Sequence, residues 1–348
     1  MQKLAVIISP NWKDYAQNYL ADCLASLRKQ TYKDYDLFLI DNESSEQSFN
    51  FLKKTAPEDT VIPLEKNEGF AGGNNAAIKL AIEKGYDFIF LVNMDTVLDE
   101  KCLAELMAVA QKNPQAAIQS RLMLWPETNK INSLGNVTHF LGFGYCDAYG
   151  KKITEQIMHE KEIAYPSGAA VLLPTKILKQ VGLFDEGMWM YNEDQDLGWR
   201  FWLSGHCCLL APQSVVYHKY EFSRSIKKLY WLDRNRIIAI LKNYHVLTLL
   251  LILPAFIVME LGLILFSLKS GWLKEKIRVW QYFLSLKNWH YLLRARRQSQ
   301  MLRQTSDRKI TKYFSGKIWY QEIDDVKLRF INPIFNVYWK IVRLIMFW

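Results

Sequence analysis

The 348-residue sequence lacks the marks of a secreted or disulfide-stabilised protein. It has five cysteines, an odd number, and none forms a CxxC pair. This excludes a disulfide framework and a CxxC-type zinc or redox site, and it predicts free thiols in a reducing compartment. The start has one lysine and about five apolar residues before Ser9-Pro10, too few for a signal peptide. We therefore expect the chain to begin and function in the cytosol.

The sequence also has no internal repeat and no low-complexity tract. Half of its residues are apolar and 23% are charged. This balance excludes wholesale disorder, and the length is typical of two or three domains with a large core.

Acidic residues are scarce in the last third of the chain. Residues 223–348 contain 7 Asp and Glu against 23 Lys and Arg, whereas residues 1–222 contain 28 against 21. The asymmetry predicts two parts with different tasks, 1–222 and 223–348. The basic part is also rich in tryptophan and tyrosine, a combination that suits nucleic acid or an anionic membrane surface.

Short apolar runs alternate with longer helical patterns over residues 1–120. This rhythm predicts an α/β fold with a doubly wound sheet that binds ligands at the carboxyl ends of its strands. After an irregular stretch at 121–166, regular patterns return. The predicted strands are Leu4–Ile8, Leu37–Ile40, Thr60–Leu64, Phe88–Val92, Ala169–Leu173 and Cys207–Ala211, and the predicted helices are 15–30, 71–84, 99–112 and 193–204.

Three polar segments follow predicted strands. Asp95 comes just after Phe88–Val92 and could hold a divalent ion, although it could equally cap the next helix. The glycine-rich turn at 67–75 could bring backbone N–H groups to a phosphate, or simply start a helix; it is neither a P-loop nor GxGxxG. Asp41 could bind a nucleobase or ribose, or form an Asx-turn.

The densest acidic cluster lies at 190–200. Glu193 or Asp194 could act as a general base in a cleft, while helix-dipole complementarity is the structural alternative. His218 ends an apolar run, where it is either structural or a metal ligand that pairs with Asp95.

Taken together and in this order, these motifs resemble those of the family 2 glycosyltransferases with a GT-A fold, most closely the rhamnosyltransferase-like branch. The resemblance covers residues 3–222. It rests on Asn11-Trp12, SLRKQTY at 26–32, DNESS at 41–45, NEGFAGGNN at 67–75, NMDT at 93–96, SGAAVLL at 167–173 and GLFDEGMWMYNEDQDLGWR at 182–200, followed by His218.

The resemblance implies a GT-A (Rossmann-like, mixed-sheet) catalytic domain that inverts the configuration of the transferred sugar. Asp194 would be the catalytic base, beside Glu193 in a Glu-Asp pair. Asp95, in a DxD-type motif in which Asn93 replaces the first acidic residue, would bind Mn²⁺ or Mg²⁺ together with His218. The implied donor-binding residues are Asn11, Trp12, Asp41, Asn67, Gly69, Phe70, Ala71, Gly72, Gly73, Asn74, Asn93 and Asp95, and the acceptor-binding residues are Gly168, Trp189 and Arg200.

The resemblance also implies the substrate classes. The donor would be a nucleotide sugar, first dTDP-rhamnose and second UDP-galactofuranose, and the acceptor a hydroxyl of a glycan or lipid-linked glycan in cell-envelope polysaccharide synthesis. Two other functions share this sheet: a sugar nucleotidylyltransferase, which should carry an Arg-containing glycine loop after the first strand, and a catalytically inactive membrane-bound scaffold. A nucleic-acid-binding protein would not need the 182–200 cluster.

The basic part contains a run of 23 residues, 246–268, with Glu260 as its one ionisable group. It is long enough to span a bilayer, but Pro254 and the 17 Lys and Arg beyond 268 favour a re-entrant or interfacial segment on the cytoplasmic face of the plasma membrane. A buried core helix is the alternative. Residues 333–348 form an amphipathic helix that we expect to lie in the membrane interface. Oligomeric state is left open.

Overall fold

The computed structural model describes residues 2–153, 159–219, 229–319 and 326–348. The chain divides into two compact units. The first comprises Met1–Asn136, Cys146–Phe201 and His206–Tyr220, and the second comprises Val137–Tyr145, Trp202–Gly205 and Glu221–Trp348. The division thus differs from the predicted one by two short segments that join the second unit. The predicted boundary at 222/223 lies outside the described residues.

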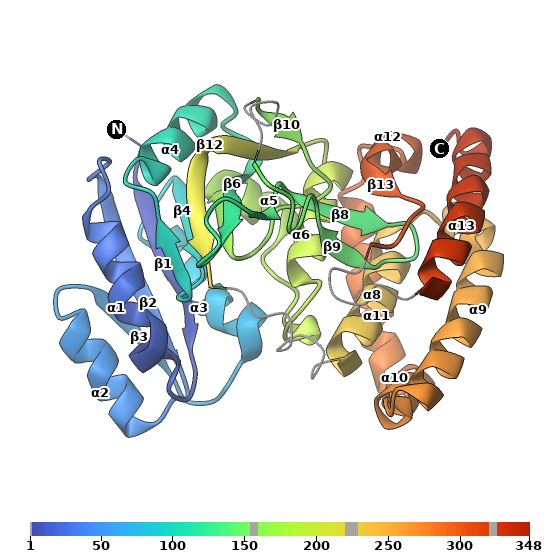
Figure 1. The fold of residues 1–348 in the computed structure, drawn as a ribbon, viewed down its shortest axis with the longest axis horizontal. Helices are drawn as coiled ribbons and strands as arrows, with labels where there is room; N and C mark the ends of the chain where they lie inside the picture. The colour runs from blue at the N-terminus through green and yellow to red at the C-terminus, as the bar shows by residue number, and fades with distance from the viewer. Residues whose placement is uncertain (1, 154–158, 220–228, 320–325) are drawn as a thin grey trace. The chain divides into compact units, whose positions relative to one another are not determined.

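The first unit is built on a mixed sheet with the strand order β10-β12-β6-β11-β4-β1-β2-β3 (Figure 1). In addition, β5 pairs with β12, and β7 with β6. The strands are β1 Leu4–Asn11, β2 Tyr35–Asn42, β3 Thr60–Leu64, β4 Phe88–Val92, β5 Thr96–Leu98, β6 Ala117–Leu124, β7 Ile131–Ser133, β10 Lys161–Glu162, β11 Ala170–Pro174 and β12 Cys208–His218.

Helices cover both faces of this sheet. Alternate residues of β1, β2 and β4 pack with the helices α1 (Tyr15–Arg28), α2 (Glu46–Thr55) and α4 (Cys102–Lys112) in one apolar cluster. Helix α3 (Gly69–Glu83) is not part of this cluster, although it also contacts β1 and β2. Because successive side chains of a strand point to opposite faces, this two-sided burial explains the uninterrupted apolar runs of β1 and β4.

The parallel strands β1, β2, β3 and β4 confirm the predicted doubly wound α/β fold. The structure adds what the sequence pattern missed. β6 is an eight-residue strand that enters the stretch expected to be irregular, and β12 continues seven residues beyond the predicted end at Ala211, to His218. Short helix α5 (Thr175–Val181) follows β11.

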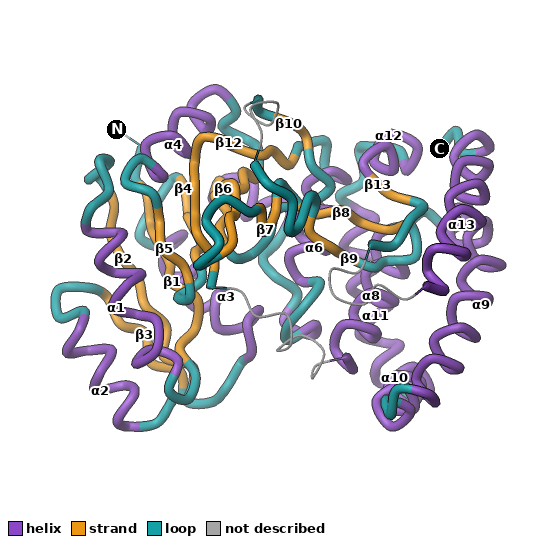
Figure 2. The backbone as a smooth tube through the Cα atoms, in the orientation of Figure 1, coloured by secondary structure: helices purple, strands orange, loops and turns teal. Residues whose placement is uncertain are grey.

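The second unit is mostly helical, as Figure 2 shows by colour. A small three-stranded sheet, β13 (Phe314–Ser315), β8 (Asn136–His139) and β9 (Gly144–Cys146), accompanies the helices. The helices are α8 Leu229–Asn243, α9 Val246–Lys269, α10 Leu273–Leu284, α11 Leu286–Met301, α12 Asp307–Ile310 and α13 Val326–Ile345.

Helix α13 differs from the predicted C-terminal helix in its start and its packing. It begins at Val326 and contains Pro333. Phe335, Trp339 and Val342 are buried, and the Trp339 ring stacks on Phe140 with centroids 4.9 Å apart. One face of the helix is therefore part of the core of this unit, so the predicted helix packs onto the fold as well as exposing apolar residues.

Four buried charged side chains join α8, α9 and α10. Lys276 Nζ lies 2.7 Å from a carboxylate oxygen of Asp233 and 2.7 Å from one of Glu260. Arg236 pairs with the same two carboxylates. The two cations hold the pKa of Asp233 below its ordinary value against the opposing effect of burial. Glu260, the one charge of the apolar run, is thus used to hold three helices together.

Removing Glu260 should destabilise the helical unit. Glu260→Ala leaves two buried cations with one carboxylate fewer, and we expect a loss of about 3–5 kcal/mol in the free energy of unfolding. Glu275→Ala, which breaks the exposed Glu275–Arg278 pair (2.6 Å), should cost at most about 1 kcal/mol. Urea unfolding followed by circular dichroism measures both, and similar small losses would contradict this role of Glu260.

Candidate active site

The predicted site residues meet at one edge of the sheet in the first unit. β11 runs antiparallel to β4, with Ala170 opposite Val92, so residues 167–169 lie beside the segment that follows β4. The backbone N–H of Asn93 donates to the carbonyl of Ala169 (2.9 Å). The neighbouring Gly168 N–H donates to Asp194 Oδ2 (3.2 Å). A chain of direct contacts therefore links the NMDT turn to the acidic pair.

The glycine-rich turn is held by Asn42, at the end of β2. Its side-chain amide donates to the carbonyl of Gly69 and to Asn67 Oδ1, both at 3.1 Å. Its Oδ1 accepts from the backbone N–H of Glu68 (2.9 Å). These three bonds fix the chain where it enters α3.

Gly69 is in close contact with Trp189. Its φ is +68°, and a Cβ there would lie 2.5 Å from the Trp189 carbonyl oxygen. That oxygen accepts from the N–H of Ala71 (3.0 Å). Only glycine tolerates both the positive φ and the close approach. The contact joins the predicted donor turn to the segment that precedes the acidic pair.

The segment before helix α6 (Glu193–Leu203) is strained. Trp189, Tyr191 and Asn192 all have positive φ, between 63° and 66°. Such conformations cost about 1–3 kcal/mol each for non-glycine residues and persist where surrounding structure imposes them, often at functional sites. Glu193 and Asp194 directly follow this strained segment and lie in the first turn of α6.

Glu193 and Asp194 are neighbours with different environments: Glu193 is buried and Asp194 is half-buried. Burial raises the pKa of Asp194 to about 6, while hydrogen bonds from the N–H groups of Gly168 and Gln195 lower it. Burial and the adjacent Asp194 charge raise the pKa of Glu193 well above its ordinary value. Environments that push two carboxyl pKa values apart assign different roles to them. Asp194 is the member whose carboxylate accepts hydrogen bonds from two backbone N–H groups.

Asp95 and His218 form a second pair of neighbouring polar side chains. Thr96 in β5 pairs with His218 at the end of β12, which brings His218 Nε2 within 3.3 Å of Asp95 Oδ1. His218 Nδ1 lies 3.1 Å from Asn132 Oδ1. A carbonyl oxygen at Nδ1 leaves Nε2 as the nitrogen that faces Asp95, the arrangement that supports a metal-binding histidine.

The chemistry of this donor set fits a divalent cation. Asp95 offers a carboxylate and His218 an imidazole, ligands that Mn²⁺ accepts. Asn93 Oδ1, two residues before Asp95, is buried without a hydrogen-bond partner among the described residues. The described residues contain no group of three His, Cys, Asp or Glu side chains that could hold a metal by themselves. Any ion here would need further oxygen ligands, from Asn93, water or a bound substrate.

Asn11 and Asp41 lie together at the ends of β1 and β2. The Asn11 amide donates to Asp41 Oδ1 (3.0 Å) and to Ser48 Oγ (3.1 Å), and both Asn11 and Asp41 are buried. Ser44 also donates to Asp41 through its side-chain hydroxyl and its backbone N–H, so the local turn that was the alternative for Asp41 is present. Trp12 is 43% exposed beyond the end of β1.

Arg200 has a structural role in place of the predicted acceptor contact. Its Nε donates to Asp196 Oδ2 (2.9 Å), and its other nitrogens donate to the carbonyls of residues 181–183. The side chain is buried. The guanidinium thus ties α6 to the end of α5.

Sequence reasoning missed three supporting amides. Asn42 orients the glycine turn, Asn132 orients His218, and Asn75 joins α3 to the 184–186 segment by donating to the Phe184 carbonyl (2.9 Å) and Glu186 Oε1 (3.0 Å). Asn42 and Asn75 stand inside the quoted DNESS and NEGFAGGNN motifs, so their motifs carried a signal. Asn132 lies in the stretch expected to be irregular and had none.

The Gly69–Trp189 contact gives a matched test. Gly69→Ala should lower both stability and catalysis because the new Cβ meets the Trp189 backbone. Gly85→Ala is the control, since Gly85 also has positive φ (+77°) but open space around its Cβ. It should cost only the left-handed penalty, about 1–2 kcal/mol. Thermal unfolding and turnover of the two variants check this, and equal losses would contradict the contact's importance.

Comparison with known proteins gives the family. Residues 6–182 match the family described as "Glycosyl transferase family 2". The chain is 26% identical over 221 residues to the N-acetylglucosaminyl-diphospho-decaprenol L-rhamnosyltransferase of Mycobacterium tuberculosis, covering 58% of this chain and 71% of the relative. It is 24% identical over 206 residues to the poly-beta-1,6-N-acetyl-D-glucosamine synthase of Staphylococcus epidermidis, covering 56% of this chain and 47% of that protein.

Solved structures show the same fold. TarS 1-349 of S. aureus, in complex with UDP, superposes with a TM-score of 0.51 at 16% identity, covering 99% of this chain and 90% of TarS 1-349. GalNAc-T7 with UDP, GalNAc and Mn²⁺ gives 0.53 at 15% identity, covering 69% of this chain and about half (47%) of GalNAc-T7. The family match spans half of the chain and includes the glycine turn, the NMDT turn and Gly168. The chain therefore belongs to glycosyltransferase family 2 and is rhamnosyltransferase-like.

Proposed function

We propose that this glycosyltransferase transfers a sugar from a nucleotide-sugar donor to a hydroxyl of a glycan or lipid-linked acceptor in cell-envelope polysaccharide synthesis, with inversion. The observation that carries the proposal is the half-buried Asp194 carboxylate, which accepts hydrogen bonds from two backbone N–H groups. The relatives support the class of acceptor. One is named for a decaprenol-linked substrate and another for a polysaccharide.

Asp194 acts as the general base. Its pKa of about 6 keeps it ionised at neutral pH while making it a stronger base than an ordinary carboxylate. It removes the proton from the acceptor hydroxyl as the oxygen attacks the anomeric carbon of the donor, and the bond to the nucleoside diphosphate breaks on the opposite face. A single displacement of this kind inverts the anomeric configuration.

Asp95 and His218 would hold a divalent ion, Mn²⁺ or Mg²⁺, when the donor is bound. When bound, the ion stabilises the negative charge that develops on the leaving diphosphate. Asn93, whose Oδ1 is buried without a partner among the described residues, supplies an oxygen to the donor or to the ion. The Mn²⁺ in the structure of GalNAc-T7 supports this for a protein of the same fold.

The donor side is formed by the glycine turn and the ends of β1 and β2. Asp41, oriented by Asn11, contacts the nucleobase, and the turn at 67–75 shapes the sugar pocket. Gly168 and Trp189 face the acceptor. dTDP-rhamnose is the first candidate donor because one relative is an L-rhamnosyltransferase, and UDP-galactofuranose is the second.

The acidic pair should respond unequally to substitution. Asp194→Asn should lower turnover at least about a hundredfold, because base removal has this effect. Glu193→Gln, which mimics the protonated state, should cost far less. The wild-type rate should fall as the pH drops through about 6, where Asp194 gains a proton. Steady-state kinetics test this assignment, and it fails if Glu193→Gln is the more damaging change.

The metal site should be measurable without turnover. Asp95→Ala should weaken binding of Mn²⁺ in the presence of UDP, followed by electron paramagnetic resonance, and chelation should abolish turnover of the wild type. Glu58→Ala removes an exposed carboxylate elsewhere in the same unit and should change neither. Full activity after exhaustive chelation would leave charge stabilisation to basic side chains and helix N-termini.

We also propose that the second unit binds the cytoplasmic face of the membrane through α9 and α13. α9 is the one helix among the described residues that is long and apolar enough to cross a membrane, and 22% of its most apolar stretch is buried. Its polar residues Thr248, Glu260 and Ser267 are buried, while most of its leucines, together with Ile257, are exposed to different degrees. This distribution is the reverse of a water-exposed helix and speaks against a buried core helix.

The two helices lie side by side (Figure 1). Tyr338 donates its hydroxyl hydrogen to the Leu251 carbonyl, and Trp348 Nε1 donates to Thr248 Oγ1 (2.8 Å). We define the membrane face as their exposed apolar residues: Leu250, Leu253, Ile257, Leu261 and Leu265 of α9, and Val337, Ile341 and Leu344 of α13. Because Glu260 is bonded into α8 and α10, α9 lies along the interface with its unit and does not span alone.

Charges on the membrane face should release the protein. The double variant Leu261→Asp with Leu344→Asp should bind anionic liposomes at least about tenfold more weakly. Each leucine side chain that enters the membrane contributes about 1.5–3 kcal/mol to binding. Met301→Asp is the control, because Met301 is equally exposed at the end of α11 but outside the face. Co-sedimentation measures liposome binding of the wild type, the double variant and the control. Unchanged liposome binding by the double variant would refute the assignment of this face.

A further inference from the structure

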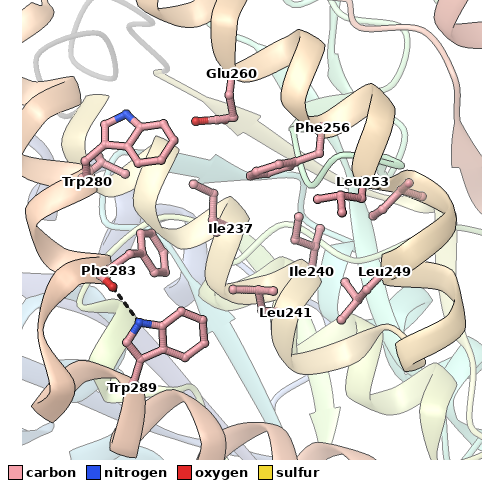
Figure 3. Close-up of a pocket in the computed structure, with 12 residues that line it drawn as sticks. Ile237, Ile240, Leu241, Leu249, Leu253, Phe256, Glu260, Trp280, Phe283 and Trp289 are labelled. Atoms are coloured by element: carbon pink, nitrogen blue, oxygen red, sulfur yellow. Dashed lines mark hydrogen bonds between the residues drawn. The ribbon is translucent and has the colours of Figure 1, made fainter.

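Helices α8, α9, α10 and α11 line an apolar cavity of about 220 Å³ (Figure 3). Leucine, isoleucine, valine and aromatic side chains form its wall, including Ile240 of α8, Leu249 and Phe256 of α9, and Phe283 of α10. Protein interiors are close-packed, and few voids exceed the size of a water molecule. A cavity this large is therefore a candidate for occupation.

The cavity reaches the surface at aromatic and aliphatic side chains. Leu253, Trp280 and Trp289 line it and are 47%, 45% and 38% exposed. Trp289 Nε1 donates to the Phe283 carbonyl (2.6 Å), which orients its ring at the rim, as Figure 3 shows. Leu253 also belongs to the membrane face, so the opening adjoins the surface proposed to meet lipid. Tryptophan at such a rim is typical of the boundary between lipid and water.

The polar chemistry of the wall selects against a polar ligand. Glu260 is the only charged residue in the lining, and both of its carboxylate oxygens are bonded to Arg236 and Lys276. A hydroxylated or charged guest would lose hydration and gain little. A hydrocarbon chain makes no hydrogen bonds to water, so it loses none when it enters the cavity.

The helices around the opening are strongly basic on their outer sides. α10 and α11 contain seven Lys and Arg against one acidic residue, Glu275. The exposed cations are Lys274, Arg278, Lys287, Arg294 and Arg297. An apolar cavity beside exposed cations is complementary to a lipid that joins a hydrocarbon chain to an anionic head.

We propose that the cavity binds a segment of the isoprenoid chain of an isoprenoid-diphosphate-linked acceptor. This inference rests on the proposed function, which supplies the lipid-linked acceptor. The volume exceeds the roughly 150 Å³ of a cavity that holds benzene and accommodates about one or two isoprene units. The exposed cations of α10 and α11 lie on the side of the diphosphate.

The test uses farnesyl diphosphate as the probe and the full-length protein without nucleotide sugar. Leu249→Trp fills the cavity and should weaken binding, measured by calorimetry below the probe's micellar concentration, at least about tenfold; exclusion of even two methylene groups is equivalent to about that factor. Leu247→Trp is the matched control, two positions earlier on the opposite side of α9, exposed and outside the cavity lining. It should bind as the wild type does. Equal weakening in both variants, or in neither, overturns the proposal.

A second measurement tests the proposal even if Leu249→Trp misfolds. It also compares the probe with another lipid. Farnesyl diphosphate should change the tryptophan emission of the wild type, and Trp280→Phe with Trp289→Phe should remove at least half of that change. No change in the wild type overturns the proposal. Dodecyl phosphate should bind at least about fivefold more weakly, and equal affinity would assign the cavity to ordinary acyl chains and overturn the isoprenoid assignment. Because no donor is present, a chain without transferase activity would still give the binding result, and an active chain that fails it refutes only this inference.

Discussion

The antiparallel pairing of β11 with β4 is the constraint on which the active site depends. It places Gly168, just before β11, beside the NMDT turn that follows β4. The Gly168 N–H then reaches Asp194, so the proposed base Asp194 and the proposed metal ligand Asp95 are positioned by one strand register. Both strands are fully buried, and a slip of one residue would turn their apolar side chains to the wrong faces of the sheet. Core packing therefore fixes the spacing of the catalytic groups.

The site stores unfavourable features that the rest of the first unit stabilises. Two adjacent carboxyl groups are withdrawn from solvent, Glu193 fully and Asp194 in part, and three non-glycine residues before them have left-handed backbone conformations. Neither feature would persist in an exposed loop. The Trp189 carbonyl bonded to Ala71 and the Asn75 contacts with residues 184–186 hold the strained segment against α3. Burial, which is costly to the carboxylate, is also what gives Asp194 its basicity.

In the second unit, several charged side chains are buried and many apolar side chains are exposed. Its ion pairs among Asp233, Arg236, Glu260 and Lys276 are buried, whereas much of the apolar surface of α9 is exposed. Buried ion pairs fix the arrangement of α8, α9 and α10 without requiring leucines in the interior. The leucines are then available for a membrane. A chain that acts on lipid-linked acceptors needs such a surface and a place for the lipid chain.

The sequence predicted the strands β1, β2, β3 and β4 and the family, because continuous apolar runs and short motifs are local signals. It also separated the basic, aromatic-rich part from the acidic one. It could not predict that Arg200 donates hydrogen bonds to the carbonyls of residues 181–183, that Asn132 orients His218, or that Glu260 pairs with two cations. Each of these depends on residues distant in the chain meeting in space. The acidic pair was recognised as a motif, but the choice of Asp194 over Glu193 gains physical support from burial and from two specific N–H groups.

The central claim is that Asp194 and the Asp95–His218 pair catalyse sugar transfer by a single displacement. The most direct measurement is a screen of nucleotide-sugar donors with the purified chain and a polyprenyl-diphosphate-linked sugar acceptor. It would record the release of nucleoside diphosphate with and without Mn²⁺ or Mg²⁺, and the anomeric configuration of the product by NMR. The account predicts metal-dependent release from one donor and an inverted anomer. A product that retains the donor's configuration would contradict it.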